Sequence, residues 1–187
     1  MKKLIFLPLI LLYSCSRNGF VENLINIDNY YIKDLEYKDF SIQRLENIDV
    51  SQLKEIDSND YVSIRQKKYN SAKHYYYSIK NISNINSVVY FYFNEGKEKA
   101  FVLENYDNDK QLLSEIIISS IAGDGGYFSN SEGRFINDST IIREDETGYY
   151  NWVMNPNSDN DDKVIESYNK LRIILKRDGS FKTDTIN

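Results

Sequence analysis

The feature that most constrains the fold is an alternation of apolar and polar residues with a period of two, which dominates the chain from residue 61 onward. This period is typical of β-strands, whereas an amphipathic helix repeats every 3.6 residues. The apolar runs are rich in Ile, Val, Tyr and Phe, and turn residues such as Asn94-Glu95-Gly96 separate them. Short strands joined by tight turns predict an antiparallel meander. The expected strands cover residues 61–69, 74–79, 87–93, 99–105, 112–121, 134–137, 140–144, 149–154, 164–176 and 181–186.

The turn Arg177-Asp178-Gly179 allows the register of the last hairpin to be predicted. A two-residue loop would leave apolar and polar side chains mixed on both faces. A three-residue loop, with its glycine in the left-handed conformation, pairs Leu175 with Phe181 and Arg172 with Asp184. One face is then apolar and the other carries an opposite-charge pair, so we expect this second register.

The turn Asn94-Glu95-Gly96 fits the same template, which pairs Val88 with Val102 and Tyr90 with Ala100. Side chains on both faces of this pair are apolar or aromatic near its middle. Such a pattern is typical of strands that are buried on both sides, so we expect a central hairpin covered on both faces.

A chain of 187 residues has room for one domain with one core. We expect residues 61–187 to form a mainly β domain, a single antiparallel meander arranged as a sandwich or an up-and-down barrel-like sheet. Residues 15–60 are polar and mixed, and we expect a tether and a polar N-terminal segment there. A short helix is predicted over residues 51–56, where Ser51 is placed to cap it.

Composition excludes several classes of protein. The chain is 41% hydrophobic and 27% charged, which indicates a globular protein, and its net charge of −5 gives no general attraction to nucleic acid. A single cysteine excludes internal disulfides and multi-cysteine metal sites. The 16 tyrosines are weak evidence for a binding surface, because AT-rich codons encode tyrosine.

The N-terminus carries a targeting signal. Lys2 and Lys3 precede an apolar run over residues 4–13, which is too short to span a bilayer. The run ends in Leu12-Tyr13-Ser14-Cys15, which resembles the lipobox of bacterial lipoproteins. The resemblance implies that residues 1–14 are a signal peptide, that cleavage falls between Ser14 and Cys15, and that Cys15 is lipidated. Tyr13 departs from the pattern, being bulkier than the usual residue.

The same resemblance implies a location. Residue Ser16, after the cysteine, is not the Asp that signals retention in the inner membrane, so we expect a lipid anchor in the outer membrane. Surface-displayed lipoproteins of the Bacteroidota carry an acidic cluster after the cysteine, and residues 16–20 have none. We therefore expect a periplasm-facing protein whose mature part is generally similar to small lipoproteins of AT-rich Bacteroidota.

The sequence contains no recognisable catalytic set, and we expect no catalytic residue and no cofactor. His74 is the only histidine, so any triad would have to include it, and its strand context predicts a surface or edge-strand side chain. Paired carboxylates for a small hydrolase remain open among 28 acidic residues. The glycines in Gly123-Asp124-Gly125-Gly126 predict a wide turn and a candidate recognition loop rather than a phosphate cradle.

Residues 155–166 carry a weak candidate for a calcium loop. Oxygen-bearing side chains occur at alternate positions, and a glutamate follows at the spacing of a bidentate ligand. The leading Asp and the central Gly of such loops are absent, so we expect a solvated turn and no metal site. The candidate ligands are Asn155, Asn157, Asp159, Asp161 and Glu166.

Aromatic stretches form the remaining candidate surface, because exposed Tyr and Trp side chains stack on sugar rings or anchor protein partners. The candidate partner-binding aromatics are Tyr75, Tyr77, Tyr90, Tyr92, Tyr150 and Trp152. We therefore expect a non-catalytic, membrane-anchored envelope lipoprotein that binds a protein or an envelope polymer and no nucleic acid. The alternatives are a carrier of a lipid or small apolar ligand with a barrel-like lumen, and a carboxylate-dependent hydrolase.

Overall fold

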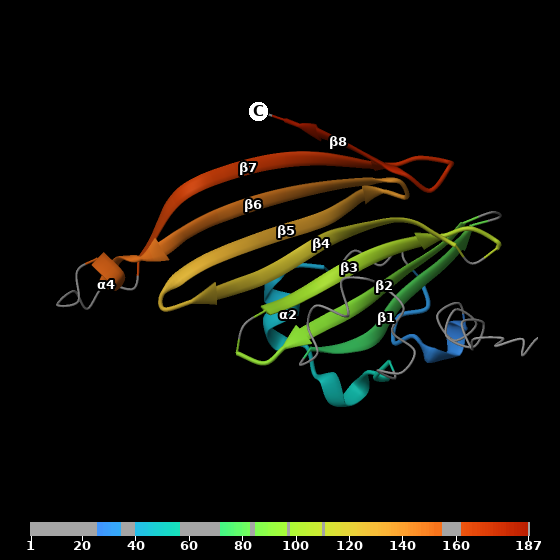
Figure 1. The fold of residues 1–187 in the computed structure, drawn as a ribbon, viewed down its shortest axis with the longest axis horizontal. Helices are drawn as coiled ribbons and strands as arrows, with labels where there is room; N and C mark the ends of the chain where they lie inside the picture. The colour runs from blue at the N-terminus through green and yellow to red at the C-terminus, as the bar shows by residue number, and fades with distance from the viewer. Residues whose placement is uncertain are drawn as a thin grey trace, which may run out of the picture.

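The computed structural model describes residues 26–34, 40–56, 72–82, 85–96, 98–109, 111–154 and 162–186. Its main element is one eight-stranded antiparallel sheet in which each strand pairs with its neighbours in sequence (Figure 1). The strands are β1 (Lys73–Ile82), β2 (Ile85–Asn94), β3 (Glu98–Tyr106), β4 (Leu112–Asp124), β5 (Tyr127–Asn137), β6 (Thr140–Tyr150), β7 (Lys163–Leu175) and β8 (Phe181–Thr185). The predicted mainly β, antiparallel meander is confirmed, as one open sheet with β1 and β8 at its edges.

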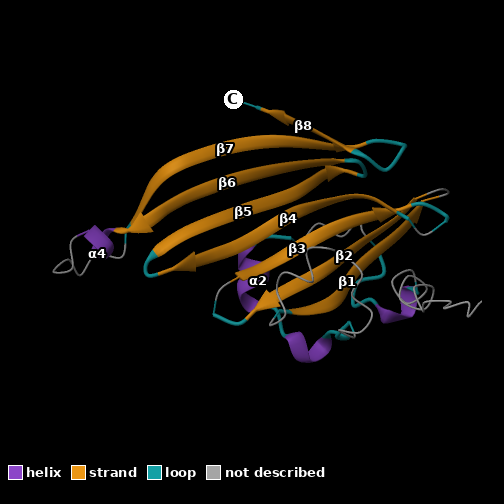
Figure 2. Cartoon of the chain, in the orientation of Figure 1, coloured by secondary structure: helices purple, strands orange, loops and turns teal. Residues whose placement is uncertain are grey.

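The described helices are few and short (Figure 2). The predicted short N-terminal helix is present but lies earlier than expected, because the capping residue is Ser41. The Oγ atom of Ser41 accepts a hydrogen bond from the backbone N–H of Arg44 over 3.1 Å. The helical elements are η1 (Ile27–Asn29), α2 (Ile42–Asn47), η2 (Val50–Gln52) and α4 (Asn151–Met154).

Two of the predicted elements differ from the structure. The position expected for the short helix, residues 51–56, is wrong, since only the 3₁₀ turn η2 reaches into that range. The strand expected over residues 149–154 is also wrong, since β6 ends at Tyr150 and the next four residues form α4. The strand expected over residues 61–69 lies outside the described residues.

The two predicted hairpin registers have different outcomes. In the β7–β8 hairpin, Leu175 pairs with Phe181 and Arg172 pairs with Asp184, as predicted, and Gly179 has a φ of +80°. In the β2–β3 hairpin the predicted register is wrong by two residues, because Tyr90 pairs with Val102. A shift of two leaves each side chain on its expected face, so the predicted distribution of apolar side chains survives the error.

Both faces of β2 and β3 are buried, as expected for a central hairpin. On one face, which we call the α2 face, Phe91 and Phe101 pack with Phe40 and other residues of the N-terminal segment. On the opposite face, which we call the Tyr90 face, Tyr90 packs with Tyr30. Each face excludes water from a separate apolar cluster, and the sheet is the layer between them.

The N-terminal segment also covers the outer edge of β1. The backbone N–H of Ile32 donates to the carbonyl of Tyr77 over 2.8 Å, and that of Ile56 donates to the carbonyl of His74 over 2.8 Å. These bonds occupy part of an edge that would otherwise be open to another chain. Residues 26–34 and 40–56 are therefore part of the folded domain and not of a tether, in contrast to the prediction.

The sheet divides at the contact between β4 and β5, which pair over only five residues next to their turn. Farther from the turn, hydrogen bonds made by side chains connect the two halves of the sheet in place of strand pairing. The backbone N–H of Gly133 donates to Ser119 Oγ over 2.9 Å, and Arg143 Nη1 donates to the carbonyl of Ile117 over 2.8 Å. Because the strands separate here, β5–β8 need not follow the plane of β1–β4.

The β7–β8 turn folds back against the first half of the sheet. The Nδ2 atom of Asn105, in β3, donates to the carbonyl of Gly179 over 3.0 Å, and Ser114 Oγ donates to the same carbonyl. At the opposite end of the strands, the turn between β4 and β5, the end of β6, α4 and the start of β7 extend beyond β1–β3 (Figure 1, left). We call this part of the molecule the distal end.

The close contact of β6 with β7 predicts a strong effect of substitution at Gly148. A Cβ atom on Gly148 would collide with the backbone carbonyl of Val164 and would lie 3.0 Å from Cζ of Phe128. We expect Gly148→Ala to lower the free energy of unfolding by about 3 kcal/mol. The control Gly96→Ala, with nothing within 4 Å of its Cβ, should lose only about 1 kcal/mol through its positive φ. Urea unfolding measures both, and equal losses would contradict this account of the contact.

Candidate functional site

Several predicted site residues lie outside the described part of the chain: Ser14, Cys15, Asn155, Asn157, Asp159 and Asp161. Glu166 is described and is exposed on β7, where it forms a bulge opposite the step from Thr147 to Gly148. Among the described residues no group of three or more His, Cys, Asp or Glu side chains is placed to hold a metal ion.

Four of the six candidate aromatics are buried, which corrects the expectation of an exposed aromatic surface on β1 and β2. These four are Tyr75, Tyr77, Tyr90 and Tyr92. The reason is that segments far away in sequence cover both faces of these strands. Only Tyr150, which is half-buried, and Trp152, which is 40% exposed, remain at the surface, and both lie at the distal end.

His74 lies on the edge strand β1, so the edge-strand alternative of the prediction holds and the surface alternative does not, because the residue is only 3% exposed. Its ring centroid lies 5.4 Å from that of Tyr90 and 5.2 Å from that of Tyr92. Burial disfavours the charged imidazolium and lowers the pKa of His74 to about 4. A histidine that stays neutral among tyrosines acts as a packing residue of the Tyr90 face.

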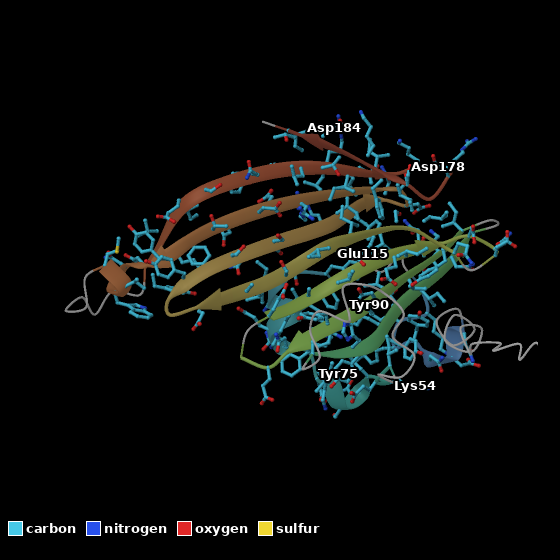
Figure 3. All side chains as sticks on the ribbon, in the orientation of Figure 1. Lys54, Tyr75, Tyr90, Glu115, Asp178 and Asp184 are labelled. Carbon is cyan, nitrogen blue, oxygen red and sulfur yellow. The ribbon has the colours of Figure 1, made fainter. Side chains whose placement is uncertain are left out.

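A pair of carboxylic acids also lies on the Tyr90 face. Glu104 in β3 is 1% exposed and directly opposite Glu115 in β4, while Tyr90 lies on the other neighbouring strand, β2 (Figure 3). The hydroxyl of Tyr106 donates to Glu104 Oε2 over 2.5 Å. Burial, and then the negative charge of Glu115, raise the pKa of Glu104 to about 7. The pair lines neither of the two clefts described below.

A cleft of about 360 Å³ opens between α2 and the distal end of the sheet. Its position follows from the fold, because α2 covers β3 to β5 and leaves the projecting ends of β5–β7 bare. Aromatic, aliphatic and charged side chains line it together. They include Phe93, Tyr127, Phe128 and Tyr150, with Ile42 and Ile121, and the polar residues Glu46, Glu98, Lys99, Asn130 and Lys163.

The two lysines of the cleft are held by neighbouring groups. Lys99 Nζ donates to the carbonyl of Glu46 over 3.2 Å, and Lys163 Nζ donates to Glu146 Oε1 over 3.4 Å. Each ammonium also lies over an aromatic ring, with Lys163 Nζ 5.0 Å from the ring centre of Phe128. Two lysines and two glutamates line the cleft, so its formal charge is zero.

Asn130 provides an acceptor that the fold does not use. Its side chain is 6% exposed, and Nδ2 donates to Glu146 Oε1 over 3.4 Å. That bond turns Oδ1 to the opposite side of the amide, where it has no hydrogen-bond partner among the described residues. An unpaired buried acceptor costs about 1–3 kcal/mol, so its retention in the wall of a cleft indicates a role in binding water or ligand.

A second cleft of about 500 Å³ adjoins the first and extends it to the end of the sheet. The two clefts share Gly123, Tyr127 and Tyr150, and Trp152 lies in the second. The predicted wide glycine turn is instead a two-residue turn, because Asp124 pairs with Tyr127. We call the two clefts together the distal groove.

Sequence reasoning found Tyr150, Trp152 and the glycine turn of the distal groove but missed its other members. Phe128, Asn130 and Lys163 come from strands β5 and β7, and Lys99 comes from β3. These residues meet only after the strands are placed. The one local signal was the pair Tyr127-Phe128, which follows the glycine turn directly.

Comparison of the chain with protein-family models, with curated proteins and with solved structures returns no match. Within the described residues, no helix is both long enough and apolar enough to cross a membrane.

Proposed function

We propose that the protein is a non-catalytic, lipid-anchored envelope protein that binds its partner in the distal groove. The observation that carries the proposal is the groove itself, in which aromatic walls meet a few polar groups and one buried acceptor without a partner in the described chain. Concave sites of this composition are the usual location of ligand binding in proteins. The apolar clusters on β1–β3 are already packed, so among the described residues we assign binding to the groove.

The anchor is the second part of the proposal and rests on the sequence. Lys2 and Lys3, the apolar run and the single cysteine at position 15 support lipidation of Cys15 and location in the outer membrane, facing the periplasm. Globomycin, which blocks cleavage of lipoprotein signal peptides, should make an unprocessed precursor accumulate. Immunoblotting detects the precursor, and unchanged processing under globomycin would contradict this part of the proposal.

The two other candidate functions receive less support. A lipid carrier needs an enclosed apolar cavity, whereas Glu46, Glu98, Lys99 and Lys163 line the observed cleft. A carboxylate-dependent hydrolase needs two acids facing a substrate site, and Glu104 with Glu115 lies outside both clefts.

The binding proposal predicts the outcome of a capture experiment from envelope extracts. We expect the double variant Tyr150→Ala/Trp152→Ala to recover at least tenfold less of the partner than the wild-type protein, because central aromatic contacts dominate binding energy. The control is Tyr31→Ala, which removes an exposed aromatic residue of the N-terminal segment that lines neither cleft. Equal recovery by all three proteins would refute the groove as the binding site.

A further inference from the structure

We infer that the distal groove binds a chain of uncharged sugar residues. The inference rests on the proposed function and names the chemical class of its ligand. It is drawn from three properties of the groove: the placement of its aromatic rings, its lack of a free cation and its unused hydrogen-bonding acceptor.

The groove carries several aromatic rings, which suits an extended ligand. Phe128 and Tyr150 belong to neighbouring strands, and their ring centres lie 5.7 Å apart. Tyr150 and Tyr127 are shared by the two clefts, and Trp152 lines the second. Sugar rings stack their C–H faces on aromatic side chains, and several rings in a groove offer sites to more than one sugar.

The charge of the groove disfavours anionic ligands. Lys163 is already bonded to Glu146, and Lys99 to a main-chain carbonyl, so neither is a free cation that awaits an anion. The two lysines are matched by two glutamates in the first cleft, and Asp124 in the second adds a further negative charge that repels anions. A neutral ligand with many hydroxyl groups can donate to carboxylates and amide oxygens and accept from ammonium groups without leaving a charge unpaired.

The unused acceptor favours a ligand that donates hydrogen bonds. Asn130 Oδ1 lacks a partner among the described residues, while Nδ2 of the same amide is held by Glu146. Oδ1 itself is covered, so a sugar hydroxyl, directly or through one water, can supply the missing donor once the neighbouring side chains move aside. An apolar ligand cannot, which argues against a lipid.

The bulged edge of β7 argues against an extended peptide as the ligand. Peptides commonly bind by adding a strand to a free sheet edge. β8 pairs with only the last five residues of β7, so the first part of β7 is such an edge among the described residues. However, Glu166 forms a bulge in this part, and bulges interrupt the regular ladder that strand addition needs.

The test uses Trp152, which is the only tryptophan of the chain and therefore reports from the groove itself. The full-length protein, in a detergent without sugar head groups, is titrated with neutral hexasaccharides of glucose, N-acetylglucosamine and mannose. We expect at least one to change Trp152 fluorescence in a saturable way. Tyr150→Ala should weaken that binding at least tenfold, Tyr150→Phe less than threefold, and Tyr31→Ala should leave it unchanged.

The alternative outcomes separate this inference from the proposed function. No saturable response to any hexasaccharide overturns the inference. A response that persists in Tyr150→Ala, with that variant folded by circular dichroism, also overturns it. If the saccharides fail while the capture experiment still depends on Tyr150 and Trp152, the groove binds a ligand of another class. If both experiments fail, the proposed function fails too.

Discussion

Replacing Phe40 by alanine is expected to lower the free energy of unfolding by about 3–5 kcal/mol, a large part of the total stability of a domain of this size. Phe40 lies outside the predicted β domain, yet its side chain is fully buried on the α2 face. Its ring centre lies 5.4 Å from that of Phe101 and 5.8 Å from that of Phe135. It therefore joins strands from both halves of the sheet at the place where β4 and β5 separate.

The backbone of the same residue is also held, because Ser119 Oγ donates to the carbonyl of Phe40 over 2.5 Å. The matched control is Ile136→Ala, which removes a side chain that is 50% exposed and should cost less than about 1 kcal/mol. Chemical unfolding followed by circular dichroism measures both variants. A loss of less than about 1 kcal/mol for Phe40→Ala would mean that the N-terminal segment does not complete the core.

The second large effect concerns the pH dependence of stability, which His74 and Glu104 influence in opposite directions. His74 has a pKa lowered from 6.5 to about 4, so its stabilising effect is present above pH 6.5 and is lost as the pH falls. Glu104 has a pKa raised from 4.5 to about 7, so its effect is present below pH 4.5 and is lost as the pH rises through 7.

Between about pH 4.5 and 6.5 the two effects cancel. In the unfolded chain the proton is on His74, whereas in the folded protein it is on Glu104, so both states bind the same number of protons. These two groups therefore leave the free energy of unfolding level across this range. Above pH 6.5 the folded state alone holds a proton, and the stability should fall until about pH 7.

Single substitutions should expose each effect. Relative to wild type, Glu104→Gln should make the free energy of unfolding rise between pH 4.5 and 6.5 by about 1.4 kcal/mol per pH unit. His74→Gln should make it fall by a similar amount per unit over the same range. Urea unfolding at a series of pH values measures both slopes. If the variants and the wild type keep parallel profiles, the two groups do not titrate as the structure indicates.

The strands and the meander could be predicted because period-two patterning and turn residues are local signals. The β7–β8 register followed from Gly179 and the charge pair of Arg172 with Asp184, both of which the structure contains. In the β2–β3 hairpin the same template predicted a register that is wrong by two residues. Apolar side chains lie on both faces of these strands, so burial does not distinguish two registers that differ by two residues and leave every side chain on the same face.

The burial of the tyrosines could not be predicted from alternation. Alternation predicts that Tyr90 and Phe91 lie on opposite faces, but it does not predict that each face is covered. The covering residues, such as Tyr30 and Phe40, lie in a segment whose polar composition resembles a tether. The distal groove was hidden for a similar reason, since Lys99, Phe128 and Lys163 come from three separate strands.

The central claim is that the partner occupies the distal groove, and photo-crosslinking in cells that make the protein tests it most directly. A photoreactive amino acid replaces Tyr127, which is 52% exposed and lines both clefts, or Tyr31, which is similarly exposed on the N-terminal segment. The account predicts a discrete cross-linked adduct from position 127 and none from position 31. An adduct from position 31 with none from position 127 would contradict it.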